Sequence, residues 1–126
     1  MEGLLIKRTL YTPKIEFKLN GDFTIEGISA PENVNMMYEP MFNWINEFKN
    51  TKPEVINFTM FFEYLNTSST KILVGFILQL KTIISDNNQL KLVWISEEDD
   101  EDMIDLAEEL EIVTGMKIKT KIIPAT

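Results

Sequence analysis

Segments typical of β-strands alternate with segments typical of α-helices along most of this chain. Three strand-like segments come first, and each later strand candidate is separated from the one before it by an amphipathic stretch, which gives the order β-β-β-α-β-α-β-α-β. A strand, a helix and a second strand joined in this way form a right-handed crossover between parallel strands. The order therefore predicts an α/β fold with a mixed sheet of about six strands, largely parallel from the third strand onward, and three main helices.

A β-hairpin is predicted near the amino terminus, after a first strand over residues 4–10. Residues 14–27 read KIEFKLNGDFTIEG, in which apolar and polar side chains alternate on both sides of an Asn-Gly pair. A two-residue turn would place Phe17 opposite a threonine and set the apolar faces of the two arms against each other. A three-residue loop with Gly21 in the left-handed conformation pairs Phe17 with Phe23 instead, and we predict this form.

The remaining helices and strands follow from apolar periodicity. The first helix is predicted to begin within residues 31–40, with Pro40 in its first turn because proline cannot donate a helical hydrogen bond. Strands are predicted over 55–65, over 90–95 with both faces buried, and over 117–123 with lysines on an exposed edge. The apolar side chains that define the three helical faces are Met37, Met41, Trp44, Ile45 and Phe48; Ile72, Leu73, Phe76, Ile77, Leu80, Ile83 and Ile84; and Met103, Leu106, Ala107 and Leu110, ahead of Gly115. We expect Trp44 and Trp94 in the core.

Composition excludes several classes of chemistry. The 126 residues, taken as a single domain over 1–126, contain no cysteine and no histidine. Disulfides, thiolate zinc sites and cysteine nucleophiles are therefore excluded, and the commonest general base and metal ligand is missing. A net charge of -8 disfavours binding to nucleic acid. We expect a protein that is not an enzyme and has no cofactor.

We expect neither a signal peptide nor a membrane-spanning segment. It begins MEGLLIKR, with an acidic residue where a signal peptide has positive charge. The longest apolar run, residues 72–80, is far shorter than the roughly 20 residues that span a bilayer. We therefore expect a cytoplasmic protein that does not interact with membranes.

Three unusually polar segments follow predicted strands. They read ISAPEN (28–33), LNTSSTK (65–71) and SEEDDED (96–102). In parallel sheets, functional loops gather beyond the carboxyl ends of the strands. We therefore expect the three segments to meet at one end of the sheet and to form the functional site.

The segment NTSST, residues 66–70, predicts a helix amino terminus with more hydroxyl groups than one cap requires. Asn66, Thr67 or Ser68 can accept a hydrogen bond from the free N–H groups there, worth about 1 kcal/mol, and capping alone explains one of them. A phosphate on such a hydroxyl would add about two negative charges, which the positive end of the helix stabilises. The segment therefore also suits a phosphorylation switch.

Each of the other two segments has a structural interpretation and a functional one. The acidic run over 97–102 is typical of a solvated helix start. Asp99, Asp100 and Asp102 could instead hold Mg²⁺ in a complex, beside a phosphate, although the spacing is not that of a calcium loop. We predict no metal site in the free protein.

In ISAPEN, Pro31 and Asn33 suit a turn into the first helix, capped by Ser29 or Asn33. Tyr38 or Met36, expected to be exposed beside this turn, could form part of a docking surface.

The chain resembles the SiaC-like bacterial regulatory phosphoproteins in segments spread along nearly its whole length. These segments are TPKIEF (12–17), ISAPEN (28–33), PMFNWI (40–45), YLNTSSTK (64–71) and WISEEDDEDM (94–103). The resemblance implies a fold similar to the STAS-like domains of anti-sigma-factor antagonists. One departure is visible, since a Gly-Thr pair often seen near the first strand of the family reads Arg8-Thr9 here.

The resemblance implies a non-catalytic switch protein in a partner-switching pathway of signal transduction. Such proteins are phosphorylated by a Ser/Thr kinase and dephosphorylated by a PP2C-type phosphatase. The unmodified form binds and activates a signalling enzyme, in the best-known setting a diguanylate cyclase that makes cyclic di-GMP and controls biofilm formation or aggregation. The phosphoacceptor of the family falls on Thr67, with Ser68, Ser69 and Thr70 as alternatives. The residues expected at the partner-binding surface are Asn66, Thr67, Ser68, Ser69, Pro31, Glu32, Asn33, Tyr38, Glu98, Asp99 and Asp100.

Two other classes of function stay open. One is a Mg²⁺-dependent phosphatase or phosphotransferase that uses the acidic run over 97–102 with Thr67 as nucleophile. It would lack a base of suitable pKa and a Gly-rich loop for the substrate phosphate. The other is a constitutive scaffold that is never modified.

Overall fold

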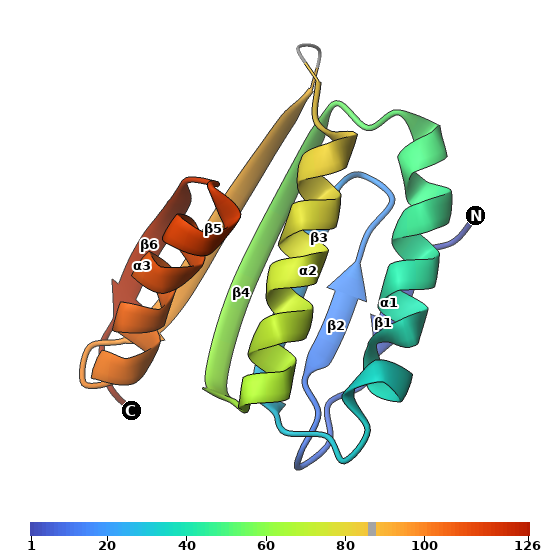
Figure 1. Ribbon diagram of the computed structural model, residues 1–126. Coiled ribbons are helices and arrows are strands. Elements are labelled where there is room, and N and C mark those ends of the chain that lie inside the picture. Colours follow the sequence, from blue (N-terminus) through green and yellow to red (C-terminus); the bar gives the residue numbers. More distant parts are fainter. Residues whose placement is uncertain (86–87) are drawn as a thin grey trace.

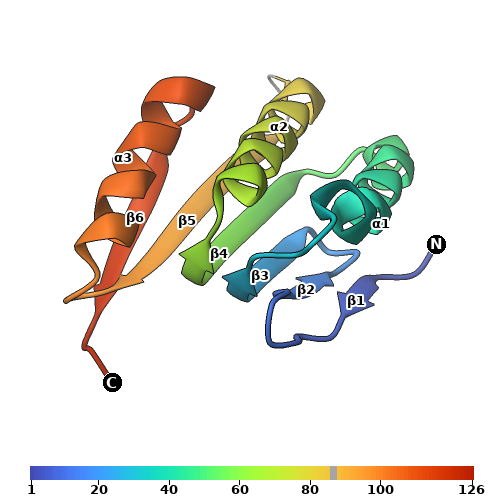
Figure 2. The same ribbon diagram turned by 60° about the horizontal axis from the view of Figure 1, so that its bottom comes forward.

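The computed structural model describes residues 1–85 and 88–126, and within them it forms one sheet covered by helices on one face (Figure 1, Figure 2). The strand order is β1-β2-β3-β4-β5-β6. The strands are β1 (Leu4–Ile6), β2 (Lys14–Phe17), β3 (Asp22–Ser29), β4 (Val55–Leu65), β5 (Gln89–Glu97) and β6 (Ile118–Ile123), and the helices are α1 (Val34–Phe48), a short 3-10 helix η1 (Lys49–Thr51), α2 (Thr67–Ile83) and α3 (Glu101–Thr114). The predicted order of strands and helices is confirmed.

The sheet is antiparallel from β1 to β3 and parallel from β3 to β6. Each crossover after β3 moves one strand further in the same direction. Right-handed crossovers of this kind place all their helices on one side of the sheet, which is the arrangement that Figure 2 shows. The prediction that the 90–95 strand is buried on both faces is wrong for this reason. Val93 and Ile95 of β5 lie on the helix-free face and are only half-buried.

The hairpin between β2 and β3 has the predicted three-residue loop. Phe17 pairs with Phe23, and the amide of Lys18 donates to the carbonyl of Asp22 at 2.9 Å. Gly21 has φ +96°, and a Cβ atom there would lie 2.1 Å from the carbonyl oxygen of Val55. Position 21 therefore requires glycine for its backbone conformation and for its close contact with the start of β4.

α1 begins within the predicted range, but the predicted end of the first strand and the predicted place of Pro40 are wrong. The first strand ends at Ile6 rather than at residue 10, because the chain then leaves the sheet and the side chain of Arg8 crosses Gly27 to pair with Glu63. Pro40 lies well inside α1 rather than in its first turn. Pro40 and Met36 are both exposed, so water can solvate the Met36 carbonyl that proline leaves without a helical donor.

The core lies between the helices and the sheet. Phe17 stacks on Phe23 with ring centroids 4.3 Å apart, and Trp44 meets Phe23 edge-on. Trp94 is fully buried, and its Nε1 donates to the carbonyl of Met103 at 2.9 Å. Both tryptophans are core residues, as predicted. No helix in the described parts of the chain is long and apolar enough to cross a membrane.

Candidate functional site

The loops that follow β3 and β4 lie side by side at the carboxyl ends of these strands. Ser29 is the register partner of Leu65 at the end of the pairing between β3 and β4. The next amide, that of Asn66, donates to the carbonyl of Ser29 at 3.0 Å. The predicted meeting of the ISAPEN and LNTSSTK segments is therefore confirmed.

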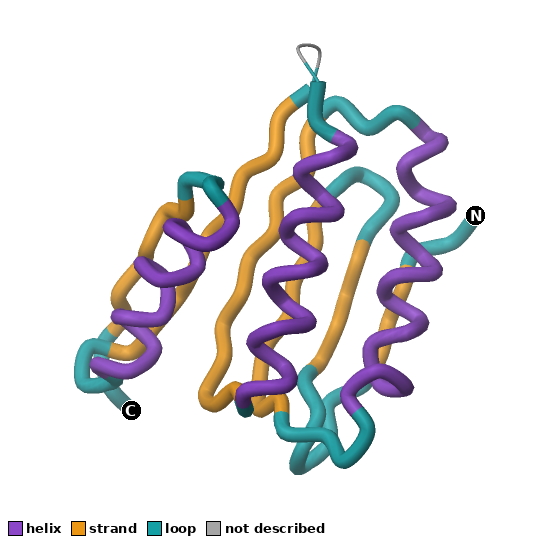
Figure 3. The backbone as a smooth tube through the Cα atoms, in the orientation of Figure 1, coloured by secondary structure: helices purple, strands orange, loops and turns teal. Residues whose placement is uncertain are grey.

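The acidic segment lies at the same end of the sheet but is set apart from these two loops. Pairing between β4 and β5 ends at Met60 and Trp94, and the two strands then diverge (Figure 3). Glu97 and Asp100 line a cavity of about 210 Å³ together with the end of β4. Within the described ranges, no hydrogen bond or ion pair joins residues 97–102 to residues 66–70. The expected convergence thus holds for two loops and only in part for the third.

Asn66 is the cap of α2. Its Oδ1 accepts the amide hydrogen of Ser69 at 2.8 Å. Its carbonyl oxygen accepts from the amide of Thr70 at 3.0 Å and from the hydroxyl of Thr70 at 3.1 Å. Among the three residues that the sequence offered as caps, Asn66 alone has this role, so the hydroxyls of Thr67 and Ser68 are not needed to start the helix.

The four hydroxyl groups of this segment have different environments. Thr67 and Ser68 are exposed, and neither hydroxyl bonds to any residue that the structure describes. Ser69 is buried, with 1% of its surface exposed. Thr70 is half-buried and donates to the Asn66 carbonyl. Two hydroxyls at the head of α2 are therefore accessible to another protein, and two are engaged within the fold.

Beneath this turn lies a group of buried hydroxyls that the sequence analysis missed. Ser29 Oγ lies 2.5 Å from the hydroxyl of Tyr38 and donates to Ser69 Oγ at 2.7 Å. Burial raises the pKa of Tyr38 to about 12, opposed in part by its hydrogen bond to Ser29. The signal in the sequence was Ser29 itself, which follows Phe23 and Ile25 in the alternation of β3 and so faces the helices.

The residues expected on the neighbouring loop lie in different surroundings. Asn33 caps α1 by accepting the amide hydrogen of Met36 at 3.0 Å, and Glu32 is exposed while Pro31 is half-buried. Met36 is 71% exposed, as expected. The expectation that Tyr38 is exposed is wrong, since only 3% of it is accessible. Its position on α1 turns the ring toward the core, where the hydroxyl finds Ser29.

The acidic segment starts α3. Asp100 accepts the amide hydrogen of Met103 at 3.2 Å and is the cap of the helix, whose first turn also carries Asp102. Glu98 and Asp99 are exposed. In the described part of the chain, no three acidic side chains gather closely enough to hold a metal ion. The geometry therefore gives no support to Mg²⁺ binding by Asp99, Asp100 and Asp102.

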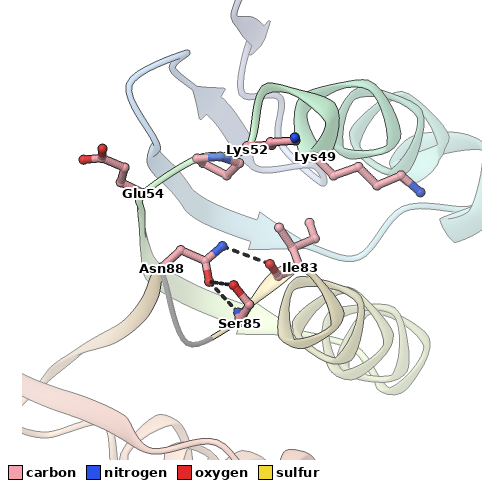
Figure 4. A pocket seen from close by; sticks show the side chains of 7 residues that line it. Lys49, Lys52, Glu54, Ile83, Ser85 and Asn88 are labelled. Carbon is pink, nitrogen blue, oxygen red and sulfur yellow. Dashed lines mark hydrogen bonds between the residues drawn. The ribbon is translucent and has the colours of Figure 1, made fainter.

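A cavity of about 390 Å³ lies at the opposite end of the sheet (Figure 4). Its lining includes Lys49, Lys52 and Glu54 on one side and Ile83 and Asn88 on the other. The amide nitrogen of the Asn88 side chain donates to the Ile83 carbonyl at 2.9 Å. This side chain thus connects Asn88 to the last residue of α2, and the lining of the cavity includes no residue of the loops that carry the accessible hydroxyls.

Comparison with known proteins gives one family and one fold. The family model of "SiaC family regulatory phosphoprotein" matches residues 6–123. The chain is similar to SiaC of Pseudomonas aeruginosa, with 22% identity, a TM-score of 0.86, and coverage of 98% of this chain and 100% of that one. It is also similar to apo-SiaC from the same organism, with 24% identity, a TM-score of 0.85, and coverage of 96% and 99%.

A third similar structure contains a partner. It is the crystal structure of the diguanylate cyclase SiaD in complex with its activator SiaC from Pseudomonas aeruginosa, matched with 24% identity, a TM-score of 0.87, and coverage of 95% of this chain and 99% of that one. At such identities the likeness establishes the shared fold. No curated protein matches the chain.

Proposed function

Because the chain belongs to the SiaC family of regulatory phosphoproteins, we propose that it is a switch in which a phosphate on Thr67 controls binding to a signalling enzyme. The observation that carries this proposal is the exposed hydroxyl of Thr67 at the first residue of α2, where the cap is already supplied by Asn66. The first turn of α2 holds no acidic residue. A phosphate there gains from the positive end of the helix and displaces no internal contact.

The proposed partner is a diguanylate cyclase, which the unmodified form binds and activates. This follows the likeness to SiaC, which is the activator of a diguanylate cyclase in the solved complex. A partner-switching Ser/Thr kinase would add the phosphate and a PP2C-type phosphatase would remove it. The cytoplasmic location expected from the sequence, and the absence of catalysis by the chain itself, are parts of the same proposal.

The proposed partner surface consists of the loops at the carboxyl ends of β3 and β4. Thr67 and Ser68 are exposed on one loop, and Glu32 and Asn33 on the other. Tyr38 and Ser69, both expected at the surface, lie beneath these loops and would act by holding them in place. Glu98 and Asp99 are exposed just before α3 and would extend the surface.

The switch would work through desolvation. A partner that packs on the head of α2 must strip water from whatever group sits at position 67. A neutral hydroxyl loses little hydration free energy. A phosphate with about two negative charges loses several kcal/mol of it unless the partner supplies a cation. Phosphorylation would therefore weaken binding without any change in the core.

The experiment that tests the proposal maps the phosphate. The chain is purified from its native cells, and the fragment that spans residues 66–71 is analysed by mass spectrometry. We expect a single phosphate on Thr67, absent in Thr67→Ala and retained in the matched control Ser68→Ala. Phosphate that persists on this fragment in Thr67→Ala would show that another hydroxyl is the acceptor.

A further inference from the structure

Three buried hydroxyl groups from three different elements are joined by hydrogen bonds under the first turn of α2, and we refer to them as the hydroxyl chain. Ser29 comes from the end of β3, Tyr38 from α1 and Ser69 from the first turn of α2. Their exposed fractions are 0%, 3% and 1%. In this hydroxyl chain, the hydroxyl oxygen of Tyr38 lies 2.5 Å from Ser29 Oγ, and Ser29 Oγ lies 2.7 Å from Ser69 Oγ.

The direction of the hydrogens in this chain is fixed. The hydroxyl of Ser69 donates to the carbonyl oxygen of Ser29 at 3.0 Å. Ser69 Oγ therefore accepts the hydrogen of Ser29 Oγ, and Ser29 Oγ in turn accepts the hydrogen of Tyr38, since each hydroxyl has one hydrogen to donate. All three hydrogens are used, and no buried side-chain oxygen or nitrogen of the described residues lacks a partner.

We propose that this hydroxyl chain determines the specificity of phosphorylation, because it withholds Ser69 from the kinase and confines modification to the exposed side of the α2 first turn. The inference rests on the proposed function. Thr67 and Ser69 are two residues apart, and a flexible NTSST segment would offer both hydroxyls to a kinase. In the fold, one is exposed and the other is buried.

Exposing Ser69 requires several bonds to break together. Its hydroxyl must leave both the Oγ and the carbonyl of Ser29, and its amide must leave Asn66 Oδ1. Each net hydrogen bond changes the population of such an opened state by roughly fivefold. Three bonds therefore suppress the opened state by a factor on the order of one hundred, before the burial of the turn is counted.

Ser29→Ala is the direct test, because it removes one of the three bonds that must break when Ser69 is exposed, the bond between the two serine hydroxyls. We expect hydrogen exchange of the Ser69 amide to become about fivefold faster, and the share of phosphate on Ser69 relative to Thr67 to rise by a similar factor. Tyr38→Phe keeps the ring and leaves all three bonds of Ser69 in place. It removes only the hydrogen bond that holds the Ser29 hydroxyl, so it should change both measurements in the same direction and by less.

Two control variants separate this effect from others. Tyr64→Phe removes the hydroxyl of an exposed tyrosine near the same turn and should change neither measurement. Thr114→Val removes a buried hydroxyl of α3, away from the three linked hydroxyls, that donates to the Leu110 carbonyl at 2.7 Å and accepts from the Met116 amide at 3.2 Å. It should lower overall stability to a similar degree while the phosphate stays on Thr67.

The outcomes distinguish the inference from the function on which it rests. A wild-type chain without phosphate on the fragment over 66–71 overturns both. The inference alone is overturned if the wild type is phosphorylated on Thr67 and both Ser29→Ala and Tyr38→Phe match it. The values compared are the distribution of phosphate between Thr67 and Ser69 and the exchange rate of the Ser69 amide. An equal shift of phosphate to Ser69 in Thr114→Val also overturns the inference, because general destabilisation would then explain the result.

Discussion

A negative charge at position 67 and the same charge at position 69 should have opposite effects on stability. Thr67 is exposed, and its hydroxyl bonds to no described residue, whereas Ser69 is 1% exposed and its hydroxyl is engaged with Ser29. The two positions lie in the same turn of the same helix. Thr67→Asp and Ser69→Asp therefore form a matched pair that differs in burial.

The expected size of each effect follows from the local structure. An aspartate at the start of α2 gains about 0.3–1 kcal/mol from the helix dipole. It also gains about 0.2–0.5 kcal/mol from Lys71, four residues on. Thr67→Asp should thus raise stability by roughly 1 kcal/mol at low salt, and less at high salt. Ser69→Asp buries a carboxylate in the space of a hydroxymethyl group and should cost about 3 kcal/mol or more.

Urea denaturation followed by tryptophan fluorescence measures both effects, because Trp44 and Trp94 are buried and report loss of the core. The two variants should share the m-value of the wild type and differ in their midpoints. A Thr67→Asp chain destabilised by about 2 kcal/mol would show that this side chain has a structural role. A Ser69→Asp chain as stable as the wild type would refute the buried position of Ser69.

Three further predictions concern single contacts. Asn66→Ala removes the cap of α2 and should cost about 1 kcal/mol in the free energy of unfolding, measured in urea, whereas a loss near zero would mean that a hydroxyl replaces the cap. Gly21→Ala should cost about 3 kcal/mol or more, because its Cβ would lie 2.1 Å from the Val55 carbonyl oxygen at φ +96°, and a wild-type melting temperature would contradict this contact. The third prediction concerns pH: the pKa of Tyr38 is raised to about 12 in the folded protein, so the folded state keeps this proton more tightly than the unfolded chain does. The contribution of Tyr38 to stability is therefore complete below pH 10 and is lost as the pH rises toward 12, by about 2–3 kcal/mol. The difference in the free energy of unfolding between the wild type and Tyr38→Phe should therefore shrink over this pH range. A constant difference between the two proteins would count against the burial of the hydroxyl.

The elements of the fold were predictable because each rests on a local pattern. Apolar alternation in β2 and β3 identified both arms of the hairpin, and the requirement that Phe17 face Phe23 selected the loop. The wrong predictions concern features that contacts with distant parts of the chain determine. Nothing local to residues 90–95 indicates that all helices lie on one side of the sheet. Nothing local to Pro40 indicates that the carbonyl it leaves without a donor is open to water.

The site was predictable as a location but not as a set of contacts. The polar segments after β3 and β4 identified the functional end of the sheet from their place in the strand order. The roles within NTSST could not be assigned, because Asn66, Thr67 and Ser68 all suit a cap. Their roles depend on the residue at which α2 begins and on the contact of this turn with Ser29, which is distant in the sequence. Tyr38 was misplaced because its burial depends on how α1 rotates over the sheet, which places its hydroxyl against a strand nine residues earlier in the sequence.

The central claim is that a phosphate on Thr67 changes what the protein binds without changing how it is folded. The most direct measurement titrates a diguanylate cyclase partner with two preparations of the chain, one unmodified and one that carries phosphate on Thr67. The amide NMR spectrum of each preparation is recorded as well. The account predicts that the modified chain binds about tenfold more weakly or worse, with spectral changes confined to residues 28–33 and 65–71. Equal affinity of the two preparations, or spectral changes throughout the core, would contradict it.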